Sequence, residues 1–407
     1  MIKSLLARIR LSYRQQRQQR QLAMLSRLDA QALATQAVPR PTEVLVVRND
    51  SIGDYLLYRS WLRQFHAVVR ARGQRLTLLA NALWAPLAEA WDSDCYEVII
   101  AVEFGRFAND LAYRAEILQR IGKQGFGEVI YPLHVREPAV ENFIRFLQAP
   151  VRVASEGAHQ VSSWFSILNT GYSQVLPSAR AILFEYYRNQ EFFENWRQLV
   201  PAASPLVTAE LPALELPQSV QEATANTGAA DPYIVLFPGA SARQKQWPVQ
   251  HFAQLAQFLH GHYAGQYRFV IAGSAADNAL AQQLIQSAGL PLPFDNRCGQ
   301  TSLPELAALL AGARLLISND TVAAHLAVQA GTACLVLLMG ENYGKFFPYP
   351  PALLRGPCQC LFPPSQELRF GQGDFSPPAQ DPDIASIEPR RVAIAAMELL
   401  RGSKAKQ

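Results

Sequence analysis

Short runs of branched apolar residues alternate, twice over, with longer segments of helical spacing. In the first half, runs rich in Val, Ile and Leu stand at 43–48, 75–80, 96–102, 128–133 and 151–155. Strands buried on both faces are apolar throughout, and strands joined through helices run parallel. The first half therefore predicts an α/β domain in which helices cover both faces of a parallel sheet.

The alternation begins again in the second half, with runs at 233–241, 267–274, 314–320 and 333–340. Between the halves, residues 195–231 are rich in Pro, Ala, Ser and Thr, which is typical of interdomain connections. The aromatic segment 166–196, which precedes this connection, is expected to be a helical insertion. The predicted organisation is a basic tail (1–40), a Rossmann-like domain (41–200), a linker (201–231), a second Rossmann-like domain (232–385) and a C-terminal helix and tail (386–407). In such folds ligands bind beyond the carboxyl ends of the strands, here in a cleft between the domains.

Basic residues are concentrated at the N-terminus. The net charge is +4, but residues 1–40 hold one acid, Asp29, and eight cations: Lys3, Arg8, Arg10, Arg14, Arg17, Arg20, Arg27 and Arg40. The remainder is slightly acidic, which argues against a nucleic-acid-binding protein. Ile2, Leu5, Leu6, Ile9 and Tyr13 follow helical spacing among these arginines, a pattern that predicts a helix on an anionic membrane surface. A solvated tail, or a helix packed on its own domain, fits the pattern equally well.

The remaining composition indicates a cytoplasmic protein, peripheral to the inner face of the membrane if the tail binds it. The five cysteines form no C-x-x-C pair, as expected for a reduced protein. No apolar run is long enough to span a bilayer, and the N-terminus lacks the apolar core of a signal peptide.

Two polar clusters at predicted strand ends of the second half suit a phosphate. In "FPGASARQKQWP" (237–248), a glycine turn, Ser241, Arg243 and Lys245 precede a helix, and such loops bind phosphates through backbone N–H groups and cations. In "SNDTVAAH" (318–325), Asp320 and Thr321 are expected to cap a helix whose first N–H groups, from Val322 onward, attract an anion.

Each of these residues also has an ordinary structural interpretation. Asp320 fits a helix cap, Lys245 a solvated surface lysine, and His325, on the first turn of the helix, a buried core histidine.

The third cluster, "NDSIGD" (49–54), follows the first strand and carries acids where a nucleotide-binding turn would carry glycines. Gly53 permits a sharp turn, and Asp54 stands at the start of the next helix, where it would also serve as a cap. Asp54 has no second carboxylate at metal-ligand spacing, which argues against a bound divalent metal.

Taken together, these stretches resemble the heptosyltransferases of glycosyltransferase family 9, which assemble bacterial lipopolysaccharide. The resemblance lies in "VLVVRNDSIGDYLL", "PGASARQKQWPVQHFAQLA", "CGQTSLPELAALLAGARLLISNDTVAAHLAVQAGTACLVLL" and "IASIEPRRVAIAAMELL". It implies a GT-B fold of two Rossmann-like domains and an inverting, metal-independent transfer from a nucleotide sugar, typically ADP-heptose, to a glycolipid acceptor. No other cofactor is implied.

The resemblance also implies roles for single residues. Asp54 matches the general base, with Ser51, Gly53 and Arg243 as candidate phosphate or acceptor contacts. The donor side matches Ser241, Lys245, Asp320, Thr321, Val322 and His325. Two positions depart from the family pattern: Val322 replaces a usual glycine, and Ala240 stands where a hydroxyl residue often occurs, so the identity of the donor stays open.

Two other functions remain open from the sequence. A sugar-nucleotide epimerase of similar fold would turn over the nucleotide sugar without an acceptor. A non-catalytic nucleotide-binding module would bind the nucleotide and turn over nothing.

Overall fold

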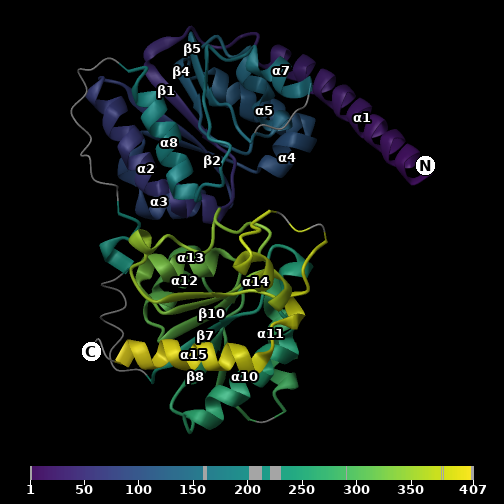
Figure 1. Ribbon diagram of the computed structural model, residues 1–407. Coiled ribbons are helices and arrows are strands. Elements are labelled where there is room, and N and C mark those ends of the chain that lie inside the picture. Colours follow the sequence, from purple (N-terminus) through teal and green to yellow (C-terminus); the bar gives the residue numbers. More distant parts are fainter. Residues whose placement is uncertain are drawn as a thin grey trace. The chain divides into compact units, whose positions relative to one another are not determined.

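The computed structural model describes residues 2–158, 163–200, 213–220, 231–289, 291–376, 378 and 380–404. The chain divides into two compact units. The first comprises 1–181 and 186–212, and the second comprises 182–185 and 213–407. Each unit holds one six-stranded sheet surrounded by helices (Figure 1). All neighbouring strands pair in parallel, which confirms the predicted α/β class.

The first sheet has the strand order β3-β2-β1-β4-β5-β6. Its strands are β1 (Arg40–Arg48), β2 (Arg75–Asn81), β3 (Val98–Val102), β4 (Phe126–Tyr131), β5 (Val151–Ser155) and β6 (Gln174–Leu176). Val44 to Val47 of the central strand β1 are completely buried, as expected for a strand with helices on both faces. The chain leaves β1 at Arg48, directly before the predicted acidic cluster.

Helices cover both faces of this sheet (Figure 1). They are α1 (Ile2–Ala32), α2 (Ile52–Ala71), α3 (Ala85–Trp91), α4 (Phe104–Asn109), α5 (Leu111–Gly122), α6 (Pro138–Glu141), α7 (Ser163–Asn169) and α8 (Glu185–Arg197), with short 3₁₀ turns η1 (Ser93–Cys95) and η2 (Asn142–Phe146). The core between the sheet and α4, α5 and η2 contains Phe107, Ile117, Leu118, Ile121 and Phe143.

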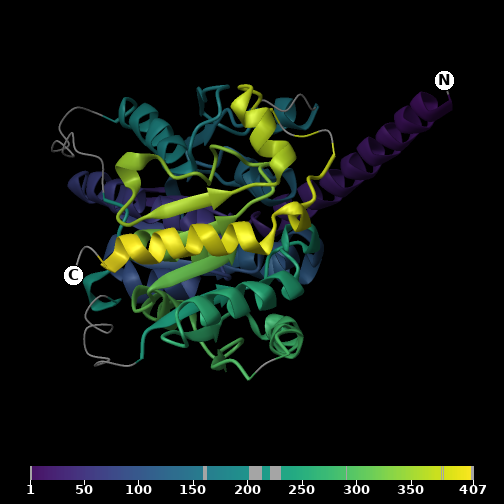
Figure 2. The same ribbon diagram turned by 60° about the horizontal axis from the view of Figure 1, so that its bottom comes forward.

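The last part of α1 belongs to the first unit and is not a separate tail. Leu22, Leu25 and Leu33 are buried, and the Asp29 carboxylate accepts bonds from Arg114 Nε at 2.6 Å and Arg114 Nη2 at 2.7 Å inside the unit. The predicted boundary at residue 40 therefore does not separate a tail from a domain, because residues from about 21 onward pack into the core. Toward its N-terminus α1 projects away from the first unit (Figures 1 and 2).

The predicted helical insertion at 166–196 is only partly helical. It contains α7 and α8, but Gln174 to Leu176 form β6, which pairs with β5 at the sheet edge. The aromatic residues of α8 pack against α2, where Trp61 and Phe65 contact Tyr186, Phe193 and Trp196. Apart from 182–185, which belong to the second unit, this segment therefore completes the first unit.

The second sheet has the order β12-β11-β10-β7-β8-β9. Its strands are β7 (Tyr233–Phe237), β8 (Arg268–Ile271), β9 (Phe294–Asn296), β10 (Leu315–Asn319), β11 (Cys334–Leu337) and β12 (Cys358–Leu361). Its α-helices are α10 (Val249–His262), α11 (Asn278–Ser287), α12 (Leu303–Ala311), α13 (Val322–Ala330), α14 (Pro364–Gly371) and α15 (Pro389–Lys404). The 3₁₀ turns are η3 (Arg243–Lys245), η4 (Ala275–Asp277), η5 (Pro351–Leu353) and η6 (Ile384–Ser386).

The predicted C-terminal helix is an integral part of this unit. Figure 2 shows α15 lying beside α10 across one face of the second sheet. Val392, Ala396 and Leu400 of α15 share a core with Leu255 of α10 and Leu335 of β11. The opposite face carries α12 and α13 (Figure 1), which leaves the start of α13 at the carboxyl ends of the strands.

The predicted linker, 201–231, lies largely outside the described residues. Its described part, 213–220, belongs to the second unit: Leu214, Leu216 and Val220 are buried, and Glu215 forms an ion pair with Arg355. No helix within the described chain combines the length and the apolar content needed to cross a bilayer.

Candidate functional site

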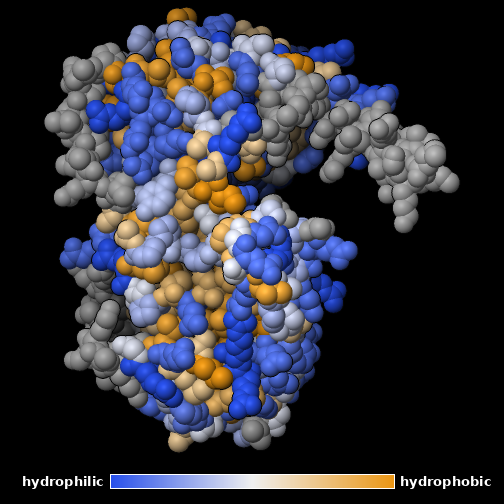
Figure 3. Space-filling view, in the orientation of Figure 1, coloured by the Kyte–Doolittle hydropathy of each residue, from blue (hydrophilic) through white to orange (hydrophobic). Residues whose placement is uncertain are grey.

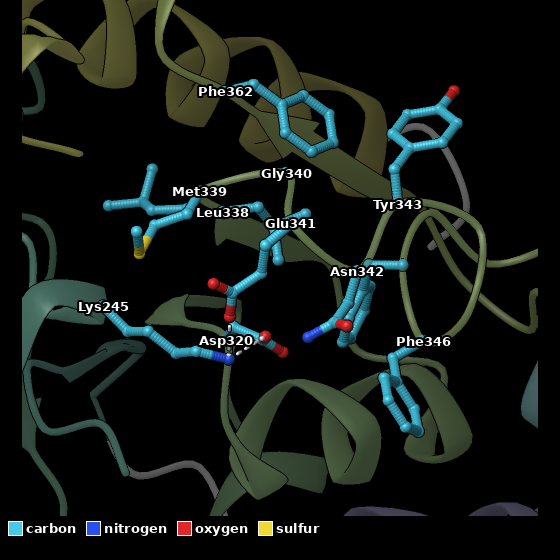
Figure 4. Close-up of a pocket in the computed structure, with 12 residues that line it drawn as sticks. Lys245, Asp320, Leu338, Met339, Gly340, Glu341, Asn342, Tyr343, Phe346 and Phe362 are labelled. Carbon is cyan, nitrogen blue, oxygen red and sulfur yellow. Dashed lines mark hydrogen bonds and ion pairs between the residues drawn. The ribbon is translucent and has the colours of Figure 1, made fainter. Parts of the chain in front are cut away.

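Three adjacent strands of the second sheet, β11, β10 and β7, end at one edge, and the segments that follow them line one pocket. β7 leads through a loop to Lys245 in η3, β10 leads to Asp320 and α13, and β11 leads to Glu341. Figure 4 shows these three side chains converging, with Tyr343, Phe346 and Phe362 also on the pocket wall. The structure thus brings together Lys245 and Asp320, two of the residues that the sequence indicated.

Two carboxylates bind the Lys245 ammonium. Its Nζ lies 2.5 Å from Glu341 Oε1 and 3.5 Å from Asp320 Oδ2 (Figure 4). Burial lowers the pKa of Lys245, but the two carboxylates more than offset this effect, and the pKa lies above its ordinary value. Lys245 is therefore charged at neutral pH and points into the pocket. This arrangement departs from the interpretation of Lys245 as a solvated surface lysine.

The loop that carries Lys245 is fixed to the end of β10 by Asn319, a residue that the sequence analysis did not single out. Asn319 Nδ2 donates to the carbonyl oxygens of Pro238 at 2.8 Å and Gly239 at 3.2 Å, and its Oδ1 accepts from Trp247 N at 3.1 Å. Asn319 is completely buried. One side chain thus holds both ends of the loop, as a rigid ligand-binding loop requires.

The other two predicted residues of this loop do not line the pocket. Ser241 and Arg243 are exposed and are absent from the pocket wall. Their predicted phosphate contacts therefore stay predictions, while the backbone around them is held by Asn319.

Glu341 was also missed from sequence. It follows β11 in "LMGENYG", which carries no phosphate-loop or helix-cap pattern. Gly340 turns the chain there with φ +89, a conformation that side chains disfavour, and a Cβ at this position would lie 2.9 Å from the Phe370 ring. The glycine directs Glu341 toward Lys245.

Helix α13 begins with Thr321 as its N-cap. The Thr321 hydroxyl accepts from Ala323 N at 3.3 Å, and the Thr321 carbonyl accepts from Ala324 N at 3.2 Å. The expectation that Asp320 shares the cap is wrong, because its side chain pairs with Lys245 instead. Two of the N–H groups expected to be open to an anion are already bonded, so Val322 N, at the first helical position, is the principal donor on this turn.

His325 lies inside the second unit, with 4% of its surface exposed. Its Nδ1 lies 2.7 Å from the Tyr349 hydroxyl, and its ring packs on Phe347. Burial lowers the pKa of His325 to about 3, so the imidazole is neutral. His325 therefore supports the wall segment 346–349 from behind. A direct contact between His325 and the donor stays a prediction.

In the first unit, the end of β1 places two acids in different environments. Asp54 stands on the first turn of α2 and is half-buried. Its Oδ2 accepts from Ser51 N at 3.2 Å and also from the Ser51 hydroxyl. The N-cap is Ser51, and Asp54 completes a capping box with it. Gly53 lies between them on the same turn.

Asp50 is the more buried acid, and Arg48 binds its carboxylate. Burial raises the pKa of Asp50 to about 7; Arg48 opposes this shift and the nearby Asp54 charge adds to it. The Asp50 carbonyl oxygen accepts from Asn81 Nδ2 and Trp84 Nε1, both at 3.0 Å. Asp50 is thus built into the core of the turn, and Asp54 is the acid better placed to meet a ligand.

The chemistry available to each unit is limited and distinct. The second unit offers an ammonium and a helix start, which suit a diphosphate. The first offers a half-buried carboxylate, which can accept a proton from a hydroxyl. Among the described residues, no group of three or more His, Cys, Asp or Glu side chains is arranged to hold a metal ion.

Comparison with known proteins adds a family. The family model described as glycosyltransferase family 9 (heptosyltransferase) matches residues 139–351, just over half of the 407-residue chain. Lipooligosaccharide heptosyltransferase 2 of Haemophilus influenzae is 30% identical over 156 residues, 37% of this chain and 43% of that protein. Lipopolysaccharide heptosyltransferase 2 of Salmonella typhimurium is 27% identical over 147 residues, 35% of this chain and 41% of that protein. The matches thus span less than half the length of these curated relatives.

Solved structures agree in fold over almost the whole chain. The E. coli ADP-heptose lipopolysaccharide heptosyltransferase II superposes with a TM-score of 0.62 at 18% identity, covering 89% of this chain and 99% of that one. A glycosyl transferase of family 9 from Veillonella parvula gives a TM-score of 0.61 at 18% identity, covering 90% and 99%. At this identity the likeness concerns the fold, and it confirms the predicted GT-B class.

Proposed function

The chain belongs to glycosyltransferase family 9, the heptosyltransferase family, and on this basis we propose that it transfers a sugar from a nucleotide donor to a lipopolysaccharide-type glycolipid. The observation that carries the proposal is the Lys245 ammonium in a pocket at the carboxyl ends of parallel strands, beside Asp320, which directly precedes the N-cap of α13. Such an arrangement binds a diphosphate and stabilises the negative charge that gathers on it as it leaves.

We propose ADP-heptose as the donor, bound mainly by the second unit. The relatives support this choice by name, since E. coli heptosyltransferase II is described as an ADP-heptose enzyme and E. coli WaaC was solved with ADP. Lys245 would bind the diphosphate together with Val322 N, and Thr321 would keep the helix start rigid. Ser241 and Arg243 would reach the ligand from the adjacent loop.

The acceptor hydroxyl is a poor nucleophile and needs a base. Asp54 is the proposed base, and the first unit would bind most of the acceptor, with Ser51 and Gly53 beside it. Direct attack of that hydroxyl on the anomeric carbon breaks the bond to the diphosphate in one displacement and inverts the configuration at that carbon. The charge on the leaving diphosphate would be balanced by Lys245 and backbone N–H groups, so the proposed reaction uses no metal.

A glycolipid acceptor would place the enzyme at the inner face of the cytoplasmic membrane, and the charge of α1 supports this part of the proposal. Its first twenty residues carry six Lys or Arg and no acid, and Gln16, Arg17, Gln19 and Arg20 are exposed. Figure 3 shows the described turns of this projecting part as hydrophilic. Basic helices of this kind bind anionic lipid headgroups.

The test is transfer and donor binding in Lys245→Ala. Loss of a charge-assisted phosphate contact is worth about 1.5–3 kcal/mol, so ADP affinity should fall roughly ten- to hundredfold. Lys345→Ala is the matched control, because Lys345 is an exposed lysine that does not line the pocket. Mass spectrometry of the glycolipid product reports transfer.

Three outcomes would contradict the proposal. Unchanged ADP affinity in Lys245→Ala would mean that the phosphate is bound elsewhere. Turnover of the nucleotide sugar at full rate without glycolipid would indicate an epimerase, and ADP binding with no turnover under any condition would indicate a binding module.

A further inference from the structure

The pocket proposed for a diphosphate is lined by one cation and two anions. Its charged lining residues are Lys245, Asp320 and Glu341. Both carboxylates lie within ion-pair distance of the single ammonium. A diphosphate that entered this arrangement unchanged would meet more negative than positive charge. Either the pocket rearranges when it binds the donor, or the affinity for the diphosphate is held low.

The two carboxylates differ in what holds them. Asp320 follows β10 directly and precedes the cap of α13, so its backbone is fixed by the strand and the helix on either side. Glu341 lies in the segment between β11 and η5, outside any helix or strand. Glu341 also makes the shorter contact with Lys245, at 2.5 Å against 3.5 Å for Asp320. Glu341 is therefore both the closer competitor for the ammonium and the carboxylate with more freedom to move away.

The surroundings of Glu341 give this movement a definite pivot. Gly340, with φ +89, adopts a backbone conformation open to glycine, and the chain turns at this residue. Beyond Glu341 the segment is held again, because Gly344 N donates to Phe347 O at 2.8 Å and Tyr343 stacks on Phe375. A rotation at Glu341 can therefore release Lys245 without disturbing the aromatic wall that follows.

We propose that Glu341 is a gating residue for the donor: it occupies the Lys245 ammonium in the ligand-free protein and yields it to the donor diphosphate. This inference rests on the proposed function. The exchange replaces a carboxylate–ammonium pair by a phosphate–ammonium pair, so no net charge pair is lost. It lowers the affinity for the diphosphate, and it helps the nucleoside diphosphate product to leave when Glu341 returns.

The decisive variant is Glu341→Gln, which keeps the shape of the side chain and removes its charge. ADP should bind about tenfold more tightly, since a charged competitor becomes a neutral one. Inorganic pyrophosphate should show the same gain, and adenosine, which has no phosphate, should show none. Tighter binding slows release of the nucleoside diphosphate product. If this release limits turnover, Glu341→Gln should lower both kcat and the KM for the nucleotide sugar.

Two controls separate gating from other effects. Glu398→Gln makes the same change of charge on the exposed face of α15, outside the pocket, and should leave ADP binding unchanged. In a Lys245→Ala background, Glu341→Gln should increase ADP affinity much less than it does in the wild type, because the ammonium for which Glu341 and the diphosphate compete is gone.

Four results would overturn the proposal. Weaker or equal ADP binding in Glu341→Gln, with the expected loss in Lys245→Ala, would show that Glu341 positions Lys245, and the proposed function would stand. If Glu341→Gln increases ADP affinity as much in the Lys245→Ala background as in the wild type, the Glu341 carboxylate simply repels the diphosphate and does not compete for Lys245. ADP binding that rises with Mg²⁺ in the wild type but not in Glu341→Gln would make the two carboxylates a cation site. If Lys245→Ala also leaves ADP binding unchanged, the phosphate site itself is wrong.

Discussion

Replacing Asp54 by asparagine separates a catalytic role from a structural one, because the structure shows what the carboxylate does for the fold. Its Oδ2 accepts from Ser51 N at 3.2 Å and from the Ser51 hydroxyl. The amide oxygen of asparagine can accept the same bonds. The loss is therefore limited to the negative charge near the start of α2, worth about 0.5–1 kcal/mol.

This loss converts into a small thermal shift. For a unit of about 200 residues, 1 kcal/mol lowers Tm by about 2–4 °C, so Asp54→Asn should melt about 1–4 °C below the wild type. An amide cannot accept the proton of the acceptor hydroxyl, and loss of a general base costs about 10²–10⁴ in rate. That loss equals about 2.7–5.4 kcal/mol of transition-state stabilisation, several times the expected loss of stability.

The assay combines a melting curve, ADP titration and glycolipid transfer on the same preparation. Asp110→Asn is the matched control, because Asp110 caps α5 and accepts from the Ala112 and Tyr113 amides. It should show a similar thermal shift and normal transfer. Near-normal transfer by Asp54→Asn would refute the base assignment. A fall in Tm well beyond that of Asp110→Asn would show that Asp54 is mainly structural, and Asp50 would be tested next.

Three further changes test other parts of the structure. The pKa of His325 lies near 3, below its unfolded value of 6.5, so between these pH values only the unfolded chain binds this proton, and the free energy of unfolding falls as the pH is lowered. In denaturant titrations, His325→Gln should therefore remove about 2 kcal/mol of the stability that the wild type loses between pH 7 and pH 5. An unchanged loss would contradict a buried neutral imidazole. Arg114→Met removes the cation that pairs with the buried Asp29 carboxylate and should lower the free energy of unfolding by about 3–5 kcal/mol. Arg297→Met, at a largely exposed pair with Asp295, should lower it by less than about 1 kcal/mol. Equal effects would mean that burial of the pair is unimportant. Deleting residues 2–20 should leave folding and ADP binding intact but weaken sedimentation with anionic vesicles, since each basic residue near such a surface contributes about 1 kcal/mol to binding. Unchanged sedimentation would show that α1 is not the membrane contact.

The strands that could be predicted are those whose apolar character comes from burial on both faces. The runs at 43–48 and 151–155 form β1 and β5 with small shifts at their ends. β9 and β12 were missed, because edge strands are short and partly polar. β12 reads Cys-Gln-Cys-Leu between prolines, and β9 is only Phe294 to Asn296. Their pairing depends on the strand beside them, which local sequence does not reveal.

For the site, local patterns indicated the residues but not their partners. Lys245 and Asp320 were found because a glycine loop and a helix start have recognisable sequences. Glu341 and Asn319 have no such sequence, since each acquires its role through contacts with segments far away in the chain. The burial of His325 and its bond to Tyr349 likewise depend on the path of the chain after β11.

The buried pair that holds α1 has a consequence for how the protein is made. Asp29 precedes Arg114 by 85 residues and Asn142 by 113. At a synthesis rate of about 5–20 residues per second, the helix waits roughly 4–17 s before its first ionic partner exists. During that interval Leu22, Leu25 and Leu33 have no core to enter, and the arginines ahead of them are already available to an anionic surface. If the ribosome works close to the membrane, α1 would therefore meet lipid before the parts of the first unit against which it packs have been synthesised.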